Sequence, residues 1–267
     1  MNRPSPLSNA PVYFALAQAR FNPVAAMADY AGKIQDRLRR KGYTVLETEQ
    51  IQGFEFNVGL PQPGQSMRTN MTNHWFFTKA DRSCGYVLGQ DFLNFQSTRY
   101  ESHQDFFDDL VAGVEIVHEI VQLEAISRLG IRYLNAILPR EGETVENYLA
   151  DGLHGVAIGG ADRKFSAWES IFETQCGDRS GTLVTKVYKA FGLVGFPVDL
   201  VAKSVQLQPK FQLNEQKHHA VIDMDHYLEA SFPAEREALL PALGALHDAI
   251  AVSFHAIATL HAFDVWE

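Results

Sequence analysis

The chain has 267 residues, of which 46% are hydrophobic and 21% are charged. These are ordinary values for a globular protein, and the length suffices for one large domain or two smaller ones. The formal net charge of -9 disfavours a broad surface for nucleic acids or anionic membranes. The two cysteines, Cys84 and Cys176, show no CxxC spacing, which suits a reducing compartment, so we expect a cytoplasmic protein.

The first predicted elements are a strand and a helix. Alternating apolar residues over 12–19 predict a strand, because residues two apart share one face. This stretch is too short and too poor in basic residues for a secretory signal, and no run of about 20 apolar residues predicts a membrane span. Asn22 and Pro23 are typical of a helix start, the apolar stripe of this helix ends at Leu38, and Gly42 marks its end.

A hairpin and a long helix dominate the rest of the first half. Strand patterns occur at 43–45 and 54–58, before a loop at 61–64. A hairpin of 75–79 and 86–88 and a third strand at 92–96 come next, and a strand at 125–138 closes this half. Between them, apolar residues at helical spacing predict a helix whose buried stripe comprises Phe106, Leu110, Val114, Val117 and Val121.

The second half repeats this alternation of strands and helices. The predicted strands are 165–174, 182–191, 201–213 and 220–227. The predicted terminal helix is 240–261, with Pro241 in its first turn and Leu246, Ile250 and Phe254 in its buried stripe. Residues 221–225 precede this helix as residues 87–91 precede the earlier one, which suggests an internal duplication.

The predicted fold class is therefore α+β, with two similar halves, 1–138 and 139–267. Each half is expected to form an antiparallel sheet of ferredoxin-like strand order packed on amphipathic helices. One continuous two-lobed domain is the alternative.

Several phrases along the chain carry a family resemblance. They are Phe21-Asn22-Pro23, Lys41-Gly42-Tyr43, the hairpin residues 76–81, Leu88 to Leu93, Arg128 to Asn135 and Ile222 to Asp225. In this order the chain resembles a sporadically distributed family of bacterial and archaeal proteins of similar length and unknown function. The resemblance implies a shared fold, and a sporadic distribution is typical of mobile or defence-linked genes.

The densest group of potential metal ligands lies near the end of the chain. Its members are His218, His219, Asp223, Asp225 and His226. On a strand Asp223 and Asp225 point to the same face, as two ligands of one ion would. The group lacks the fixed spacing of a known metal motif, so we expect no metal and no other cofactor.

Arg132 is the most informative single residue. It shares a strand face with Leu134 and Leu138, which predicts a partly buried guanidinium. A buried arginine needs carboxylate or carbonyl partners, so Arg132 is either one member of an ion pair or a ligand-binding residue. Asn135 belongs to the same phrase and is expected to face the opposite way.

Two functions are compatible with the sequence. Because no motif has catalytic spacing, we expect a non-catalytic protein that binds another macromolecule, most simply a protein partner. Three tryptophans are candidate contact residues at such an interface: Trp75, Trp168 and Trp266. The alternative is a small-molecule or metal-dependent enzyme that uses Asp223, Asp225 or Arg132 in a crevice between the halves.

Overall fold

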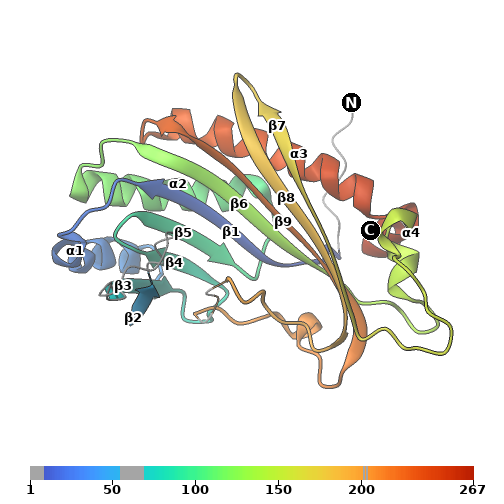
Figure 1. Ribbon diagram of the computed structural model, residues 1–267. Helices are drawn as coiled ribbons and strands as arrows, with labels where there is room; N and C mark the ends of the chain where they lie inside the picture. The colour runs from blue at the N-terminus through green and yellow to red at the C-terminus, as the bar shows by residue number, and fades with distance from the viewer. Residues whose placement is uncertain (1–8, 55–68, 201, 203) are drawn as a thin grey trace, which may run out of the picture.

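The computed structural model describes residues 9–54, 69–200, 202 and 204–267 (Figure 1). At its centre, these residues form one antiparallel sheet in the order β2-β3-β4-β5-β1-β6-β9-β8-β7. The strands are β1 Val12–Phe21, β2 Val45–Phe54, β3 Thr69–Thr78, β4 Cys84–Leu88, β5 Phe92–Ser97, β6 Ile126–Ile137, β7 Phe165–Cys176, β8 Arg179–Gly192 and β9 Lys217–Phe232. The helices are α1 Met27–Arg40, α2 His103–Val121, α3 Arg236–Ile257 and α4 Leu260–Trp266, with 3-10 turns η1 Val145–Tyr148, η2 Asp151–Leu153 and η3 Pro209–Phe211.

The two halves meet in this single sheet. β6, from the first half, pairs with β9, from the second, between Ile126↔Phe232 and Ile137↔Ala220. The α+β class is confirmed, whereas two separate ferredoxin-like halves are not, because this ladder leaves no break between them. Apart from β2, which has no counterpart, the strand order is symmetric about the β1–β6 pair: β3-β4-β5-β1 on one side mirrors β7-β8-β9-β6 on the other.

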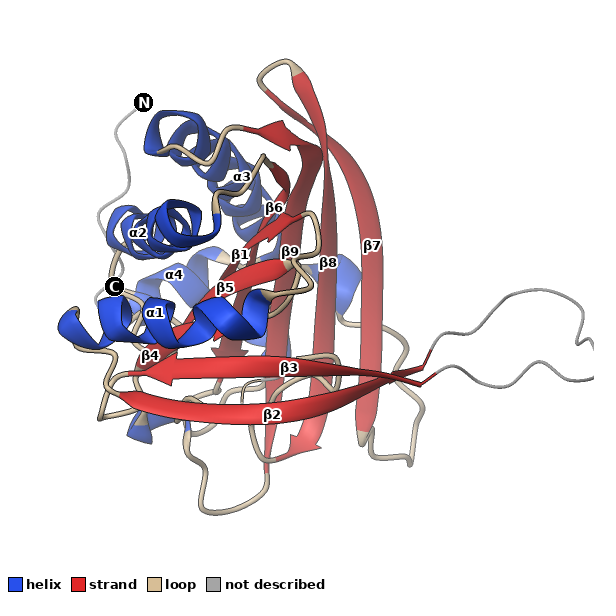
Figure 2. Ribbon diagram, turned by 90° about the vertical axis from the view of Figure 1, so that its left-hand side faces the viewer, coloured by secondary structure: helices blue, strands red, loops and turns tan. Residues whose placement is uncertain are grey.

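The main hydrophobic core lies between the sheet and the helices. Helices α1, α2 and α3 cover one face of the sheet (Figure 2). The residues predicted from helical spacing are buried there: Phe106, Leu110, Val117, Leu246 and Ile250. Phe254, also predicted, is partly buried and packs against the same core.

The opposite face of the sheet, here called the open face, is covered in part by an irregular segment, residues 193–216. Its Val205 and Phe211 pack on Tyr13, Phe14 and Leu134 in a second, smaller hydrophobic cluster. The predicted strand at 201–213 is therefore wrong in its described part: the segment holds the short turn η3 and no strand. Hydrogen bonds to the open face replace strand pairing, for example those of Gln206 and Gln208 to residues 82 and 98.

Helix ends also differ from the sequence pattern. α1 begins at Met27 and not after Asn22, because the Val24 N–H bonds to the Gln90 carbonyl and holds 22–24 as a loop. Pro241 lies inside α3, which begins at Arg236. The predicted continuous helix to 261 stops at Ile257, and Thr259 caps a separate α4.

Two further observations concern the limits of single elements. The predicted strand pattern at 54–58 is described only as far as Phe54, where β2 ends, and the loop at 61–64 lies outside the described residues.

In the described part of the chain, α3 alone is long and apolar enough to cross a membrane by length and composition. Its Leu239, Leu243 and Leu246 are buried against the core.

Candidate functional site: a polar pocket on the open face

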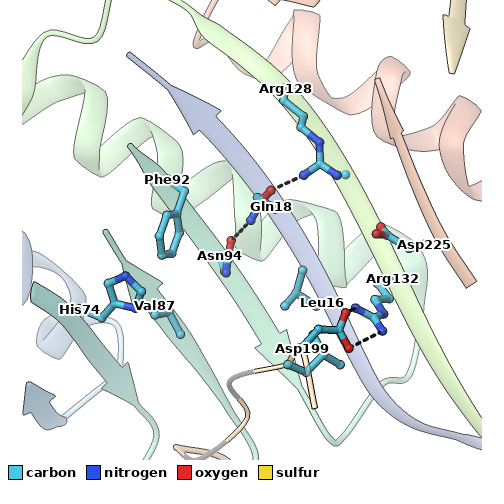
Figure 3. A pocket seen from close by; sticks show the side chains of 12 residues that line it. Leu16, Gln18, His74, Val87, Phe92, Asn94, Arg128, Arg132, Asp199 and Asp225 are labelled. Carbon is cyan, nitrogen blue, oxygen red and sulfur yellow. Dashed lines mark hydrogen bonds and ion pairs between the residues drawn. The ribbon is translucent and has the colours of Figure 1, made fainter. Parts of the chain in front are cut away.

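A pocket of about 210 Å³ lies on the open face, where six strands present side chains beneath the segment 193–216 (Figure 3). β6 contributes Arg128 and Arg132, β9 contributes Asp225, and the covering segment contributes Asp199. β1, β3, β4 and β5 supply further lining residues, which include Gln18 and Asn94, and Gly130 of β6 and Leu200 of the covering segment complete the lining. The pocket therefore spans both halves of the chain, on the side of the sheet away from the helices.

Gly130 creates part of this hollow. It lies in the centre of the sheet, opposite Gln18 on β1 and Tyr227 on β9. A Cβ atom at Gly130 would lie 3.3 Å from Tyr227 Cβ and 3.7 Å from Arg128 Nη1. A larger side chain at this position would extend from the sheet into the pocket.

Arg128 is held in place by a chain of polar contacts. Gln18 Nε2 donates to Asn94 Oδ1 at 2.9 Å, and Arg128 Nη1 donates to Gln18 Oε1. The Arg128 guanidinium also lies over the Tyr227 ring, 4.1 Å from its centroid. Within the described part of the chain, Arg128 Nε and Nη2 and Asn94 Nδ2 have no side-chain hydrogen bond, so three donor groups remain for another molecule.

Arg132, in contrast, uses its donors within the protein. Its Nε and Nη2 each bind Asp223 at 2.7 Å, and its Nη1 and Nη2 bind Asp199 at 2.6 and 3.3 Å. Burial alone would lower the pKa of Arg132, but the hydrogen bonds that it donates to the two carboxylates raise it. The same contact lowers the pKa of Asp199. Arg132 thus forms a buried ion pair with Asp223, and its second ion pair, with Asp199, connects the covering segment to the sheet.

Asp225 lies opposite Arg132 across the β6–β9 ladder, and its carboxylate lines the pocket. Figure 3 shows this carboxylate between Arg128 and Arg132 without a bond to either. No described residue makes a hydrogen bond or a salt bridge with its side chain. Burial raises the pKa of Asp225, and the charges of Arg128 and Arg132 partly offset this effect.

The structure separates the residues that the sequence offered as potential metal ligands. Asp223 and Asp225 share the open face, but His226 lies on the helix face, where its ring contacts the Leu246 carbonyl and the Thr174 hydroxyl. His218 packs against an aromatic ring, and His219 Nδ1 contacts the Lys217 carbonyl. Among the described residues, no group of three or more His, Cys, Asp or Glu side chains is placed to hold a metal ion.

The other candidate residues lie outside the pocket. Asn135 is buried and donates to the Ile222 carbonyl at 3.3 Å. Trp75 and Trp266 are core residues, 8% and 4% exposed, so they offer no contact surface here. Trp168, on the outermost strand β7, is partly buried against the core.

Among the polar pocket residues, Arg132 and Asp225 were singled out from the sequence and the others were missed: Gln18, His74, Asn94, Arg128 and Asp199. Gln18 gave a usable signal, because it is an uncharged polar residue within the apolar strand 12–19. Arg128 belongs to the phrase that carries the family resemblance, but its local pattern does not distinguish it from a solvated cation at a strand end. Asn94 has no local signal, because its role depends on its pairing with Gln18 across β1 and β5.

No family model, no curated protein and no solved structure matches the chain. The resemblance to a bacterial and archaeal family stays an expectation, and the function has to be argued from the geometry of the open face.

Proposed function

We propose that the protein binds a small polar organic molecule in the open-face pocket. The observation that carries this proposal is the unused hydrogen-bonding capacity around one hollow: donors on Arg128 and Asn94, and an acceptor on Asp225. These groups are only partly buried, and a few polar groups that converge on a hollow with apolar walls are typical of a ligand site. A volume of about 210 Å³ suits a small metabolite, because pockets for drug-sized ligands begin at roughly 300 Å³.

The proposal is for binding and not for turnover. Among the described residues that line the pocket there is no serine, threonine, tyrosine or cysteine that might act as a nucleophile. Arg132 and Asp223, which the enzyme alternative placed at a catalytic site, bind each other. Asp225 and the half-buried His74 are the titratable groups left for acid–base chemistry, and they come from opposite sides of the pocket (Figure 3).

The test is a binding screen in which the pocket is filled by mutation. Wild-type protein is titrated with a panel of small polar metabolites by calorimetry, and the hits are repeated with Gly130→Val. A valine there should project into the hollow and weaken binding about tenfold or more, while its β-branched side chain suits a strand. Gly192→Val on β8 is the matched control, because a Cβ at Gly192 meets nothing within 4 Å. Equal affinity of the Gly130→Val variant, or no hit with the wild type, would contradict the proposal.

A protein partner is the second candidate function, and one observation favours it. β7 is an edge strand of 12 residues, and three of its apolar side chains are exposed: Phe165, Ile171 and Phe172, at 61%, 68% and 45%. Edge strands carry unpaired backbone groups that can pair with a strand of another protein. We propose that such a partner, encoded in the same mobile or defence-linked locus, would add a strand to β7.

This second candidate has its own test. Cross-linking followed by mass spectrometry on complexes purified from the native host should place partner cross-links next to β7. Ile171→Lys should abolish the complex, because it puts a charge at the edge, whereas Val252→Lys on the exposed side of α3 should retain it. Cross-links concentrated elsewhere on the protein would contradict binding at β7.

We also propose that the chain arose by duplication of one unit, with the boundary between the two copies before β6 and not at residue 138. Support comes from the symmetric strand order and from the shared succession of three antiparallel neighbours and a helix, β3-β4-β5-α2 and β7-β8-β9-α3. Under this proposal the second unit begins with β6, so the pocket lies close to the axis that relates the two units.

A further inference from the structure

We infer that the ligand of the open-face pocket is a small zwitterion that carries an ammonium group and a carboxylate, as an α-amino acid does. This inference rests on the small-molecule function proposed above and adds the chemical class of the ligand. It follows from three properties of the pocket: one free acceptor, a fixed set of free donors, and the balance of charge between them.

The free acceptor is Asp225. Its carboxylate lies at the pocket wall, opposite a guanidinium whose donors are already used by Asp199 and Asp223. Neither Arg128 nor Arg132 makes a hydrogen bond to Asp225, although both are close enough to influence its charge. A ligand ammonium group would supply the charged N–H donors that this carboxylate lacks.

The free donors are those of Arg128 and Asn94. The hydrogen bond from Arg128 to Gln18 and the ring of Tyr227 hold the guanidinium from two sides, so its orientation is set before any ligand binds. Gln18 in turn occupies the Asn94 carbonyl, which leaves the Asn94 amide nitrogen as a donor on the pocket side. A guanidinium with free N–H groups is suited to a carboxylate, which accepts through both oxygens, and the Asn94 amide on the other side of Gln18 is a further donor.

The charge balance requires both ligand groups together. The network contains two guanidinium groups, Arg128 and Arg132, and three carboxylates, those of Asp199, Asp223 and Asp225. A simple anion would add a fourth negative charge beside Asp225, and a simple cation would leave the donors of Arg128 and Asn94 unused. A zwitterion satisfies both ends without changing the net charge of the pocket.

The remaining walls suit a small apolar side chain. Leu16, Val87 and Phe92 also line the pocket, and Figure 3 shows Val87 and Phe92 beside His74 on the side away from Asp225. The ring of His74 packs edge-on against Phe92, with 5.1 Å between the ring centroids. Apolar walls with a few oriented polar groups are the usual composition of a metabolite site.

The experiment uses matched probes by calorimetry on the intact protein. The twenty standard amino acids are titrated first. The best binder is then compared with its deaminated carboxylic acid and its decarboxylated amine, each of which keeps one charged group. We expect both analogues to bind about tenfold or more weakly than the amino acid, since each loses a charge-assisted contact. Analogues that bind as tightly as the amino acid would overturn the inference.

Variants then assign each end of the ligand. Asp225→Asn should weaken amino-acid binding and leave the affinity of the carboxylic acid unchanged or higher. Arg128→Met should weaken amino-acid binding and leave the affinity of the amine unchanged. Asp178→Asn, on the exposed hairpin tip where the Asp178 side chain is 96% accessible, is the control and should bind like the wild type.

The outcomes separate this inference from the function on which it rests. If no amino acid binds but other polar metabolites do, and Gly130→Val abolishes their binding, the zwitterion inference fails and the pocket function stands. If Gly130→Val does not weaken the binding of any metabolite, both fail.

Discussion

Arg132 on β6 and Asp223 on β9 form a two-bond ion pair, with Nε to Oδ1 and Nη2 to Oδ2 both at 2.7 Å. Both residues are almost fully buried, at 7% and 1% exposure. The pair joins the strands at which the two halves of the chain meet. Because Asp199 binds the same guanidinium, this contact also holds the covering segment above the pocket.

Arg132→Met should destabilise the protein by about 3 to 5 kcal/mol, because it leaves the buried carboxylate of Asp223 unpaired. The free energy of unfolding from urea denaturation measures the effect. The double variant Arg132→Met/Asp223→Leu should recover most of the loss, since it removes the unpaired charge together with its partner. An unchanged urea midpoint in Arg132→Met would contradict the prediction.

Asp199 provides the internal comparison for this ion pair. The Asp199 side chain is 59% accessible, so water can replace most of the hydrogen bonding that Arg132 provides to its carboxylate. Asp199→Asn should cost no more than about 1 kcal/mol in the same urea experiment. If Asp199→Asn lowered the free energy of unfolding as much as Arg132→Met does, the contact with the covering segment, and not the buried pair with Asp223, would account for the destabilisation.

Gly181→Ala should destabilise the fold by about 1 to 3 kcal/mol. A Cβ at Gly181 would lie 2.8 Å from His226 Nε2 and 2.9 Å from Thr174 Oγ1, between two groups that share a 2.7 Å hydrogen bond. One of them must move, and His226 is buried where water cannot replace the lost partner. Gly192→Ala on the same strand is the control for thermal denaturation and should leave the melting temperature unchanged or slightly raised, because its Cβ meets nothing within 4 Å. Equal melting temperatures for the two variants would contradict this reading.

The titration of His247 should lower the free energy of unfolding as the pH falls from 6.5 to 4. Burial, with a smaller contribution from the neighbouring His103, lowers the pKa of His247 to about 4, while Asp248 acts in the opposite direction. Below pH 6.5 His247 binds a proton in the unfolded chain but stays neutral in the folded protein. The loss of free energy of unfolding therefore grows as the pH falls and is complete near pH 4. It should amount to roughly 2 to 3 kcal/mol, less where solvent reaches the ring.

The comparison of wild type with His247→Gln isolates this titration. The variant should lose less stability than the wild type over the same interval of pH, measured by urea denaturation at each pH. Parallel curves for the two proteins would show that other buried groups, such as His226, control the acid response.

Amino-acid affinity at the pocket should decrease as the pH is lowered through the pKa of Asp225. Burial raises that pKa, so protonation sets in at a higher pH than for an ordinary aspartate, and a protonated carboxyl no longer attracts an ammonium group. Below the pKa the affinity should fall about tenfold per pH unit, because binding then requires removal of one proton. Calorimetry at a series of pH values measures the slope. Asp225→Asn should show no such slope, and an equal slope in this variant would assign the proton to another group.

Much of the local structure followed from the sequence alone. The strand at 12–19, the helix with Phe106 and Leu110, and the hairpin of 75–79 and 86–88 depend on residues only a few positions apart, so local patterns suffice to predict them. The burial and ion pairing of Arg132 also followed from one strand face, since a guanidinium between leucines requires an acid. These features are set by periodicity and by the cost of burying charge.

The pocket was decided by tertiary structure. Gln18, Asn94 and Arg128 lie on three different strands, and their meeting depends on β1 pairing with both β5 and β6. The covering segment was predicted as a strand, because its local pattern does not reveal that hydrogen bonds to distant residues hold it above the open face. Strand order is a balance of contacts across the whole sheet, whereas the sequence pattern records only which side of each strand is apolar.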